Sequence, residues 1–67
     1  MIQIKVDQRG KRFYLSSDEI PGLWLWGKDL EQLQKDLIPT VKYLYKANKG
    51  IDIQINNSDF CFVHTTN

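Results

Sequence analysis

The sequence predicts an α+β fold in which one long helix covers one face of a mainly antiparallel sheet. Three observations support this prediction. Apolar and polar residues alternate in short segments at both ends of the chain, as they do in half-buried strands. One apolar stripe with three- and four-residue spacing occupies the middle, as in an amphipathic helix. Turns rich in Gly, Pro or Asn separate these segments. Residues 1–67 are expected to form a single domain with a thin core.

Three strands are expected before the helix. Residues 2–7 alternate Ile or Val with polar residues, and Gly10 can adopt the positive φ of a tight turn directly afterwards. Residues 12–17 alternate again and should run antiparallel to the first strand. The Pro21-Gly22 pair marks a corner, because Pro lacks a backbone donor and Gly permits an unusual φ. Residues 23–26 then form a short third strand.

The helix is expected between Asp29 and Gly50. Asp29 is a good N-cap residue, Gln32 occupies the capping-box position, and Gly50 suits the C-terminal cap. Pro39 removes one backbone hydrogen bond, but the apolar stripe continues in phase across it. We therefore expect one kinked helix, not two helices. Its stripe consists of Leu30, Leu33, Leu37, Ile38, Val41, Leu44 and Tyr45.

Two strands are considered after the helix. Residues 51–56 alternate Ile with polar residues, which predicts a fourth strand. A right-handed crossover should place that strand beside the first one, giving the spatial order 3-2-1-4. Residues 60–64, FCFVH, are rich in strand formers and would lie outside strand four if they form a fifth strand.

Composition and charge exclude several classes of function. The formal net charge of +1 gives no general argument for binding to nucleic acid or a membrane. No segment approaches the roughly 18 apolar residues of a membrane span. The first residues alternate and lack the apolar run of a signal peptide. A soluble cytoplasmic protein is therefore expected. The single Cys61 excludes an internal disulfide, so self-association as a homodimer is the expected additional support.

No catalytic or metal-binding residue is expected, and no cofactor. His64 is interpreted as a strand or surface residue, and Cys61 as a buried or half-buried structural thiol, because neither has a neighbouring acid–base motif. Asp18 and Glu19 could imitate a catalytic carboxylate pair, but before IPG they are more simply loop residues. One Cys and one His do not supply the ligands of a metal site. The chain is expected not to be an enzyme.

The stretch PGLWLWG raises the question of what lies on the second face of the sheet. In a strand, Trp24 and Trp26 point to one side and the neighbouring leucines to the other. If the leucines face the helix, both tryptophans join Tyr14 and Arg12 on the second face. In the inverse orientation, the indoles help to fill the core. The other residues expected on the second face are Gln3, Lys5, Ser16, Asp52 and Gln54.

An aromatic second face has three interpretations. Loops or the end of the helix could cover the tryptophans. The face could be a protein interface, because Trp, Tyr and Arg are favoured interface anchors. It could also bind single-stranded nucleic acid, because aromatics on a sheet stack with bases while Lys or Arg contacts phosphate.

Several segments, in this order and spacing, resemble the HicB-like antitoxin domain. They are DQRG at residues 7–10, Phe13-Tyr14, SDEIPGL at 17–23 and GKDLEQL at 27–33. LIPTVKYLYKAN is similar to the proline-containing helix of a short branch that lacks the DNA-binding C-terminal segment. The resemblance covers roughly residues 1–56. It implies a partial ribonuclease H-like fold, usually dimeric, without catalytic carboxylates.

The resemblance also implies a function. Family members neutralise a small HicA-type ribonuclease toxin by covering its active site, so a non-enzymatic, antitoxin-like protein is expected here. Direct DNA binding is not expected without the C-terminal segment. Two alternatives stay open: a phage or mobile-element inhibitor of a host defence complex, and a small single-stranded RNA-binding protein. Dimerisation is expected at the edge of strand four or five. The expected partner contacts are Arg12, Tyr14, Asp18, Glu19, Trp24 and Trp26.

Overall fold

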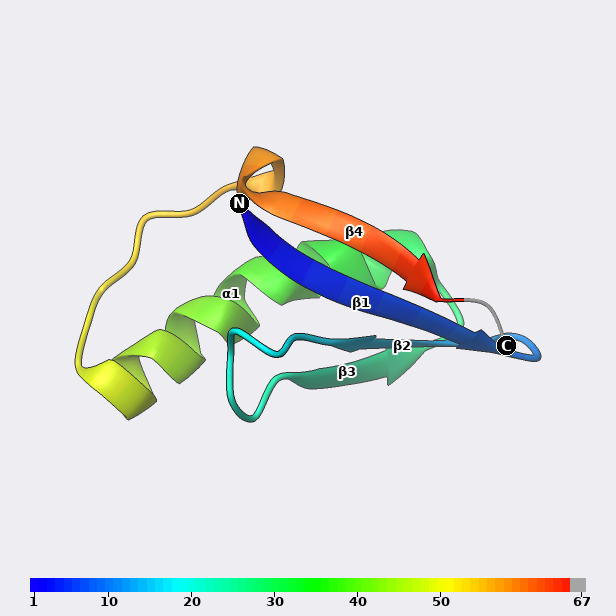
Figure 1. The fold of residues 1–67 in the computed structure, drawn as a ribbon, viewed down its shortest axis with the longest axis horizontal. Helices are drawn as coiled ribbons and strands as arrows, with labels where there is room; N and C mark the ends of the chain where they lie inside the picture. Colours follow the sequence, from blue (N-terminus) through cyan, green and yellow to red (C-terminus); the bar gives the residue numbers. More distant parts are fainter. Residues whose placement is uncertain (66–67) are drawn as a thin grey trace.

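The computed structural model describes residues 1–65, which form a four-stranded sheet with one long helix against it (Figure 1). The elements are β1 (Ile2–Arg9), β2 (Arg12–Ser16), β3 (Trp24–Gly27), α1 (Leu30–Lys49), the short 3-10 helix η1 (Asn57–Asp59) and β4 (Phe60–Thr65). The strand order is β3-β2-β1-β4. The β1–β2 and β2–β3 pairs are antiparallel, whereas β1 and β4 are parallel. This confirms the predicted α+β class, the order 3-2-1-4 and the mainly antiparallel sheet.

The helix begins and ends where its cap residues predict. The Asp29 carboxylate accepts a hydrogen bond from the backbone N–H of Gln32 at 3.4 Å. Gly50 adopts a left-handed φ of 67° and closes the C-terminal end. The Gln32 side chain donates to Asp36 Oδ1 at 3.0 Å, so it does not complete a capping box. A single helix passes through Pro39, as expected.

The predicted strand at residues 51–56 is wrong. These residues form no strand and connect α1 to η1, whereas Phe60–Thr65 lies directly beside β1 as β4. The C-terminal end of α1 extends past the start of β1, so the segment that follows has no strand beside it (Figure 1). Its isoleucines instead contribute partial burial: Ile53 and Ile55 are half-buried, and Ile55 packs against the core. The place beside β1 that was expected for residues 51–56 is therefore occupied by the segment considered as a fifth strand, residues 60–64.

The hydrophobic core lies between the sheet and the helix. The predicted stripe of α1 supplies Leu33, Leu37 and Val41, all buried. Burying each such side chain stabilises the fold by about 1.5–3 kcal/mol. Within residues 1–65, the buried apolar residues are Ile4, Val6, Leu15, Ile20, Leu23, Leu33, Leu37, Val41 and Phe60. Within residues 1–65, no helix combines the length and apolarity needed to cross a membrane.

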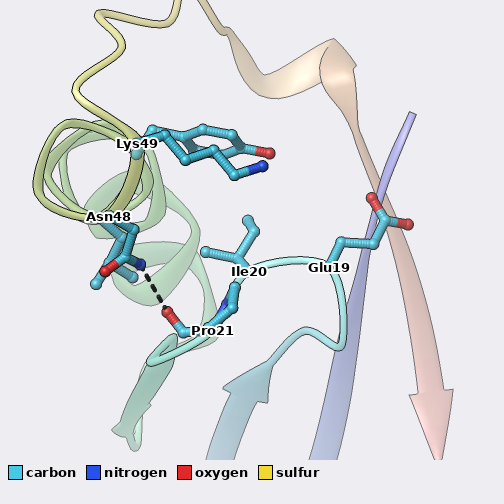
Figure 2. Close-up of a pocket in the computed structure, with 7 residues that line it drawn as sticks. Glu19, Ile20, Pro21, Asn48 and Lys49 are labelled. Atoms are coloured by element: carbon cyan, nitrogen blue, oxygen red, sulfur yellow. Dashed lines mark hydrogen bonds between the residues drawn. The ribbon is translucent and has the colours of Figure 1, made fainter.

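The loop between β2 and β3 is fixed to the core and to the helix. Ile20 and Leu23 are buried, and the N–H of Leu23 donates to the carbonyl of Ile20 at 3.2 Å. Figure 2 shows Asn48 of α1 above this loop, donating its side-chain amide to the carbonyl of Pro21 at 3.3 Å. Gly22 has a φ of 87°, which permits the corner. The anchored loop places its acidic residues at the margin of the sheet.

Candidate functional site: the open face of the sheet

The face of the sheet opposite α1 is the candidate site, and we call it the open face. No helix or strand within residues 1–65 covers it (Figure 1). Residues aligned across neighbouring strands point to the same side of a sheet. The register therefore gathers on the open face Trp24 and Trp26 of β3, Arg12, Tyr14 and Ser16 of β2, Gln3, Lys5, Asp7 and Arg9 of β1, and Cys61, Val63 and Thr65 of β4.

The two tryptophans lie on the open face and are exposed to solvent. Trp24 is 60% exposed and Trp26 is 56% exposed, whereas the adjacent Leu23 is only 4% exposed. Leu25 is half-buried and packs against the core. The leucines therefore face the helix, and the inverse orientation considered from the sequence is wrong. This exposure also excludes one of the three interpretations of the face, namely that loops or the end of the helix cover the tryptophans.

Aromatic side chains form a continuous strip with Arg12. The rings of Tyr14 and Trp24 lie 5.5 Å apart between centroids and are tilted by 36°. The Arg12 guanidinium carbon lies 5.3 Å from the centroid of the Trp26 ring, within the range of a cation–π interaction. These contacts limit the motion of the exposed rings, so less side-chain entropy is lost when a partner covers them. The predicted contacts Arg12, Tyr14, Trp24 and Trp26 thus lie together.

The charges of the open face are mostly paired within the chain. Lys5 Nζ lies 2.8 Å from Asp18 Oδ2, and Arg9 Nε lies 3.1 Å from Asp7 Oδ2. Arg12 makes no salt bridge within residues 1–65 and is therefore the cation of this face whose charge no neighbouring carboxylate offsets.

The remaining predicted contacts, Asp18 and Glu19, border the open face near Lys5. The Ser17 hydroxyl donates to the carbonyl of Gln3 at 2.8 Å and accepts from the N–H of Glu19 at 3.2 Å. The Glu19 side chain points away from Asn48 and the helix (Figure 2). Because Arg12 is next to the β1–β2 turn and Asp18 follows β2, the basic and acidic groups occupy opposite ends of β2.

Two small hollows lie on the open face. One, of about 170 Å³, is lined by Asp7, Arg9, Tyr14 and Trp24. The other, of about 110 Å³, is lined by Gln3, Lys5, Asp18, Glu19, Val63 and Thr65. Sites for small molecules usually enclose roughly 300–1,000 Å³. These hollows are smaller, so the face suits a macromolecular surface better than an enclosed small ligand.

Part of the predicted second face is wrong. Asp52 and Gln54 lie in the connection after α1 and outside the sheet. Their places are taken by Cys61, Val63 and Thr65, which could not be assigned without the correct fourth strand. Asp7 also lies on the open face, where the alternation of β1 with Gln3 and Lys5 would place it. Asp7 Oδ1 is buried and has no hydrogen-bond partner within residues 1–65.

Cys61 and His64 do not form a catalytic pair. By register Cys61 aligns with Gln3 on the open face, while His64 aligns with Val6 on the helix side. Cys61 is half-buried and His64 is exposed in a strand, which confirms the predicted placement of both residues. In the described part of the chain, no three residues among His, Cys, Asp and Glu lie close enough together to hold a metal ion.

Comparison with protein-family models, with curated proteins and with solved structures gives no match. The resemblance to the HicB-like domain, and to a ribonuclease H-like fold, therefore stays a prediction from the sequence.

Proposed function

We propose that this protein is a non-enzymatic binding module that covers a surface of a protein partner with its open face. The exposure of Trp24 and Trp26 on a sheet fixed by the helix carries this proposal. An aromatic side chain can bury on the order of 200 Å², and desolvated Trp, Tyr and Arg residues dominate many interfaces. The fold gains little from two half-exposed indoles, so binding gives the better reason for their position.

The charges favour a protein partner over single-stranded RNA. Both partners would be attracted by the aromatic strip, but RNA also needs cations for its phosphates. Lys5 and Arg9 each have a carboxylate beside them, at 2.8 and 3.1 Å, which offsets their positive charge toward phosphate and leaves Arg12 as the cation of this face without such a neighbour. One free guanidinium suits a single carboxylate or carbonyl of a protein. It provides little affinity for a phosphate backbone.

An antitoxin-like role is the specific form of this proposal. The sequence resemblance to HicB-like domains supports it, with a HicA-type ribonuclease as the partner. At one end of the face, Glu19 and Asp18 would meet the basic surface of such a partner, because the exposed pair between Asp18 and Lys5 is weak. Arg12 would set the orientation from the other end. A defence-complex inhibitor would use the same face, and the partner's identity separates the two roles. A cytoplasmic location remains a prediction.

Affinity purification from the native host with matched variants tests the proposal. The native chain should retain one protein at stoichiometric yield, and the Trp24→Ala/Trp26→Ala chain should lose it. Tyr43→Ala is the control, because Tyr43 is 71% exposed but lies on the helix. Each lost hot spot should weaken binding by at least about 30-fold, equivalent to about 2 kcal/mol.

Three outcomes would contradict this function. The first is retention of the partner by the folded double variant, and the second is equal loss with Tyr43→Ala. The third is the absence of any stoichiometric protein together with strong, salt-sensitive binding of single-stranded RNA, which would replace the protein partner with RNA.

A further inference from the structure

The hollow beside Asp7 on the open face combines a carboxylate with two aromatic rings. It has a volume of about 170 Å³ and is lined by Asp7, Arg9, Tyr14 and Trp24. Asp7 lies directly opposite Tyr14 in the β1–β2 register, and the rings of Tyr14 and Trp24 lie 5.5 Å apart between centroids. One carboxylate and two π systems therefore border the same small space.

One oxygen of the Asp7 carboxylate lacks a hydrogen-bond donor. Oδ1 is buried and has no partner within residues 1–65, which is more unfavourable for a charged acceptor than for a neutral one. The Thr65 hydroxyl, on the β4 residue aligned with Asp7, donates instead to the carbonyl of Val6 at 3.2 Å. Buried acceptors in folded proteins nearly always have a donor. A group that enters the hollow from a partner would supply this one.

Arg9 satisfies the Asp7 carboxylate only in part. Its Nε donates to Oδ2 at 3.1 Å, a single contact to the other oxygen in place of the two parallel bonds of a strong Arg–carboxylate pair. The Arg9 side chain is 70% exposed, and exposed ion pairs contribute little to stability. Displacement of the Arg9 guanidinium into solvent by another cation therefore costs little.

We propose that the hollow receives a cationic side chain, Lys or Arg, of the protein partner. This inference rests on the proposed function and names the chemical group that the open face recognises. The cation donates to the Asp7 carboxylate, whose soft terminal torsion lets it present either oxygen. The alkyl stem lies along the exposed ring of Trp24, and the π faces of Trp24 and Tyr14 attract the charge.

The residues around the hollow favour a cation over an anion or an apolar group. An anion would meet the Asp7 carboxylate and the negative faces of two rings, and among the lining residues only Arg9 would attract it. An apolar side chain would cover the carboxylate without pairing with it, which is unfavourable. The volume suits one long side chain, since sites for complete small ligands enclose roughly 300–1,000 Å³.

Titration with n-butylammonium chloride, followed by NMR, tests the charge preference directly. This probe carries the ammonium group and alkyl stem of a lysine side chain. The native chain should show saturable shifts of the Trp24 indole N–H with a dissociation constant of about 10–100 mM. Sodium butyrate, with a similar stem and the opposite charge, should give no saturation at matched ionic strength. Saturation by butyrate alone would overturn the proposal, as would no saturation by butylammonium up to about 0.5 M.

Two variants with opposite expected effects test the charged residues of the hollow. Asp7→Asn keeps the shape of the side chain without its charge, and it should weaken butylammonium binding at least about 10-fold. Arg9→Gln removes the competing cation and should strengthen binding about 2–5-fold. Asp52→Asn is the control and should change nothing, because Asp52 also lies beside a cation, Lys46 at 3.3 Å, but outside the sheet. Weaker binding by Arg9→Gln would overturn the proposal, since it would show that Arg9 helps to hold the probe.

Retention of the protein partner separates this inference from the proposed function. Asp7→Asn should weaken retention at least about 10-fold while the circular dichroism spectrum stays unchanged. Full retention by the folded Asp7→Asn chain, together with loss by Trp24→Ala/Trp26→Ala, would overturn the cation site and leave the open face as the binding surface. If Asp7→Asn does not fold, the gain expected from Arg9→Gln and the titration of the native chain decide the question.

Discussion

The two faces of the sheet carry similar apolar side chains in opposite environments. Leu23 is 4% exposed under the helix, while its neighbour Trp24 is 60% exposed on the open face. Burial of Leu23 stabilises the fold, whereas most of the Trp24 surface contacts water and contributes little. An exposed aromatic residue that the fold does not require is better explained by binding. The difference separates the residues that hold the protein together from those that act on something else.

The largest effect is expected on the helix side, from Leu37→Ala. Leu37 is fully buried in the middle of α1, and its truncation should lower the free energy of unfolding by about 2–5 kcal/mol. A domain of this size has only about 3–10 kcal/mol in total. Urea denaturation followed by circular dichroism measures the change. Tyr43→Ala on the exposed side of α1 is the control and should cost under about 0.5 kcal/mol. Similar values for the two variants would contradict the assignment of the core.

The sequence predicts an element correctly where its apolar pattern and its turn or cap residues indicate the same structure. The β1–β2 hairpin has alternating strands and Gly10 at positive φ between them, and α1 has both its apolar stripe and its caps. The strand predicted at residues 51–56 is wrong because alternation of apolar and polar residues indicates burial on one side, but not hydrogen bonding to a neighbouring strand. Ile53 and Ile55 are half-buried without a neighbouring strand. The length of α1 carries the chain past the start of β1, and pairing with β1 begins at Phe60 (Figure 1).

The candidate site was predictable to a similar extent. The alternation in β3 placed Trp24 and Trp26 on one side, but a single strand could not show which side the helix covers. The orientation of β3 depends on its register with β2. Leu15 aligns with Leu25 on the face that the helix covers, and Tyr14 aligns with Trp26 on the open face. The β4 residues of the open face could not be predicted, because the sequence pattern indicates residues 51–56 as the fourth strand.

A smaller effect on stability is expected from Trp24→Ala/Trp26→Ala. The double variant loses the ring contact with Tyr14 and the cation–π contact with Arg12, together worth about 1–2 kcal/mol. The loss should therefore be clearly less than that of Leu37→Ala, with an unchanged far-ultraviolet circular dichroism spectrum. Chemical denaturation in parallel with Leu37→Ala provides the measurement. A loss as large as that of Leu37→Ala would place the indoles in the core and remove the basis for the binding face.

The smallest effect is expected at the margin of the open face, in the pair between Lys5 and Asp18. Its charged atoms are 2.8 Å apart, but the side chains are 49% and 83% exposed, so water screens their attraction. A double-mutant cycle with Lys5→Ala and Asp18→Ala should give a coupling energy below about 0.5 kcal/mol that decreases further at high salt. The loop should keep its position, because the buried Ile20 and the Asn48 hydrogen bond hold it. A coupling above about 1 kcal/mol would show instead that this ion pair fixes the loop, and that its charges are committed to the fold and not to a partner.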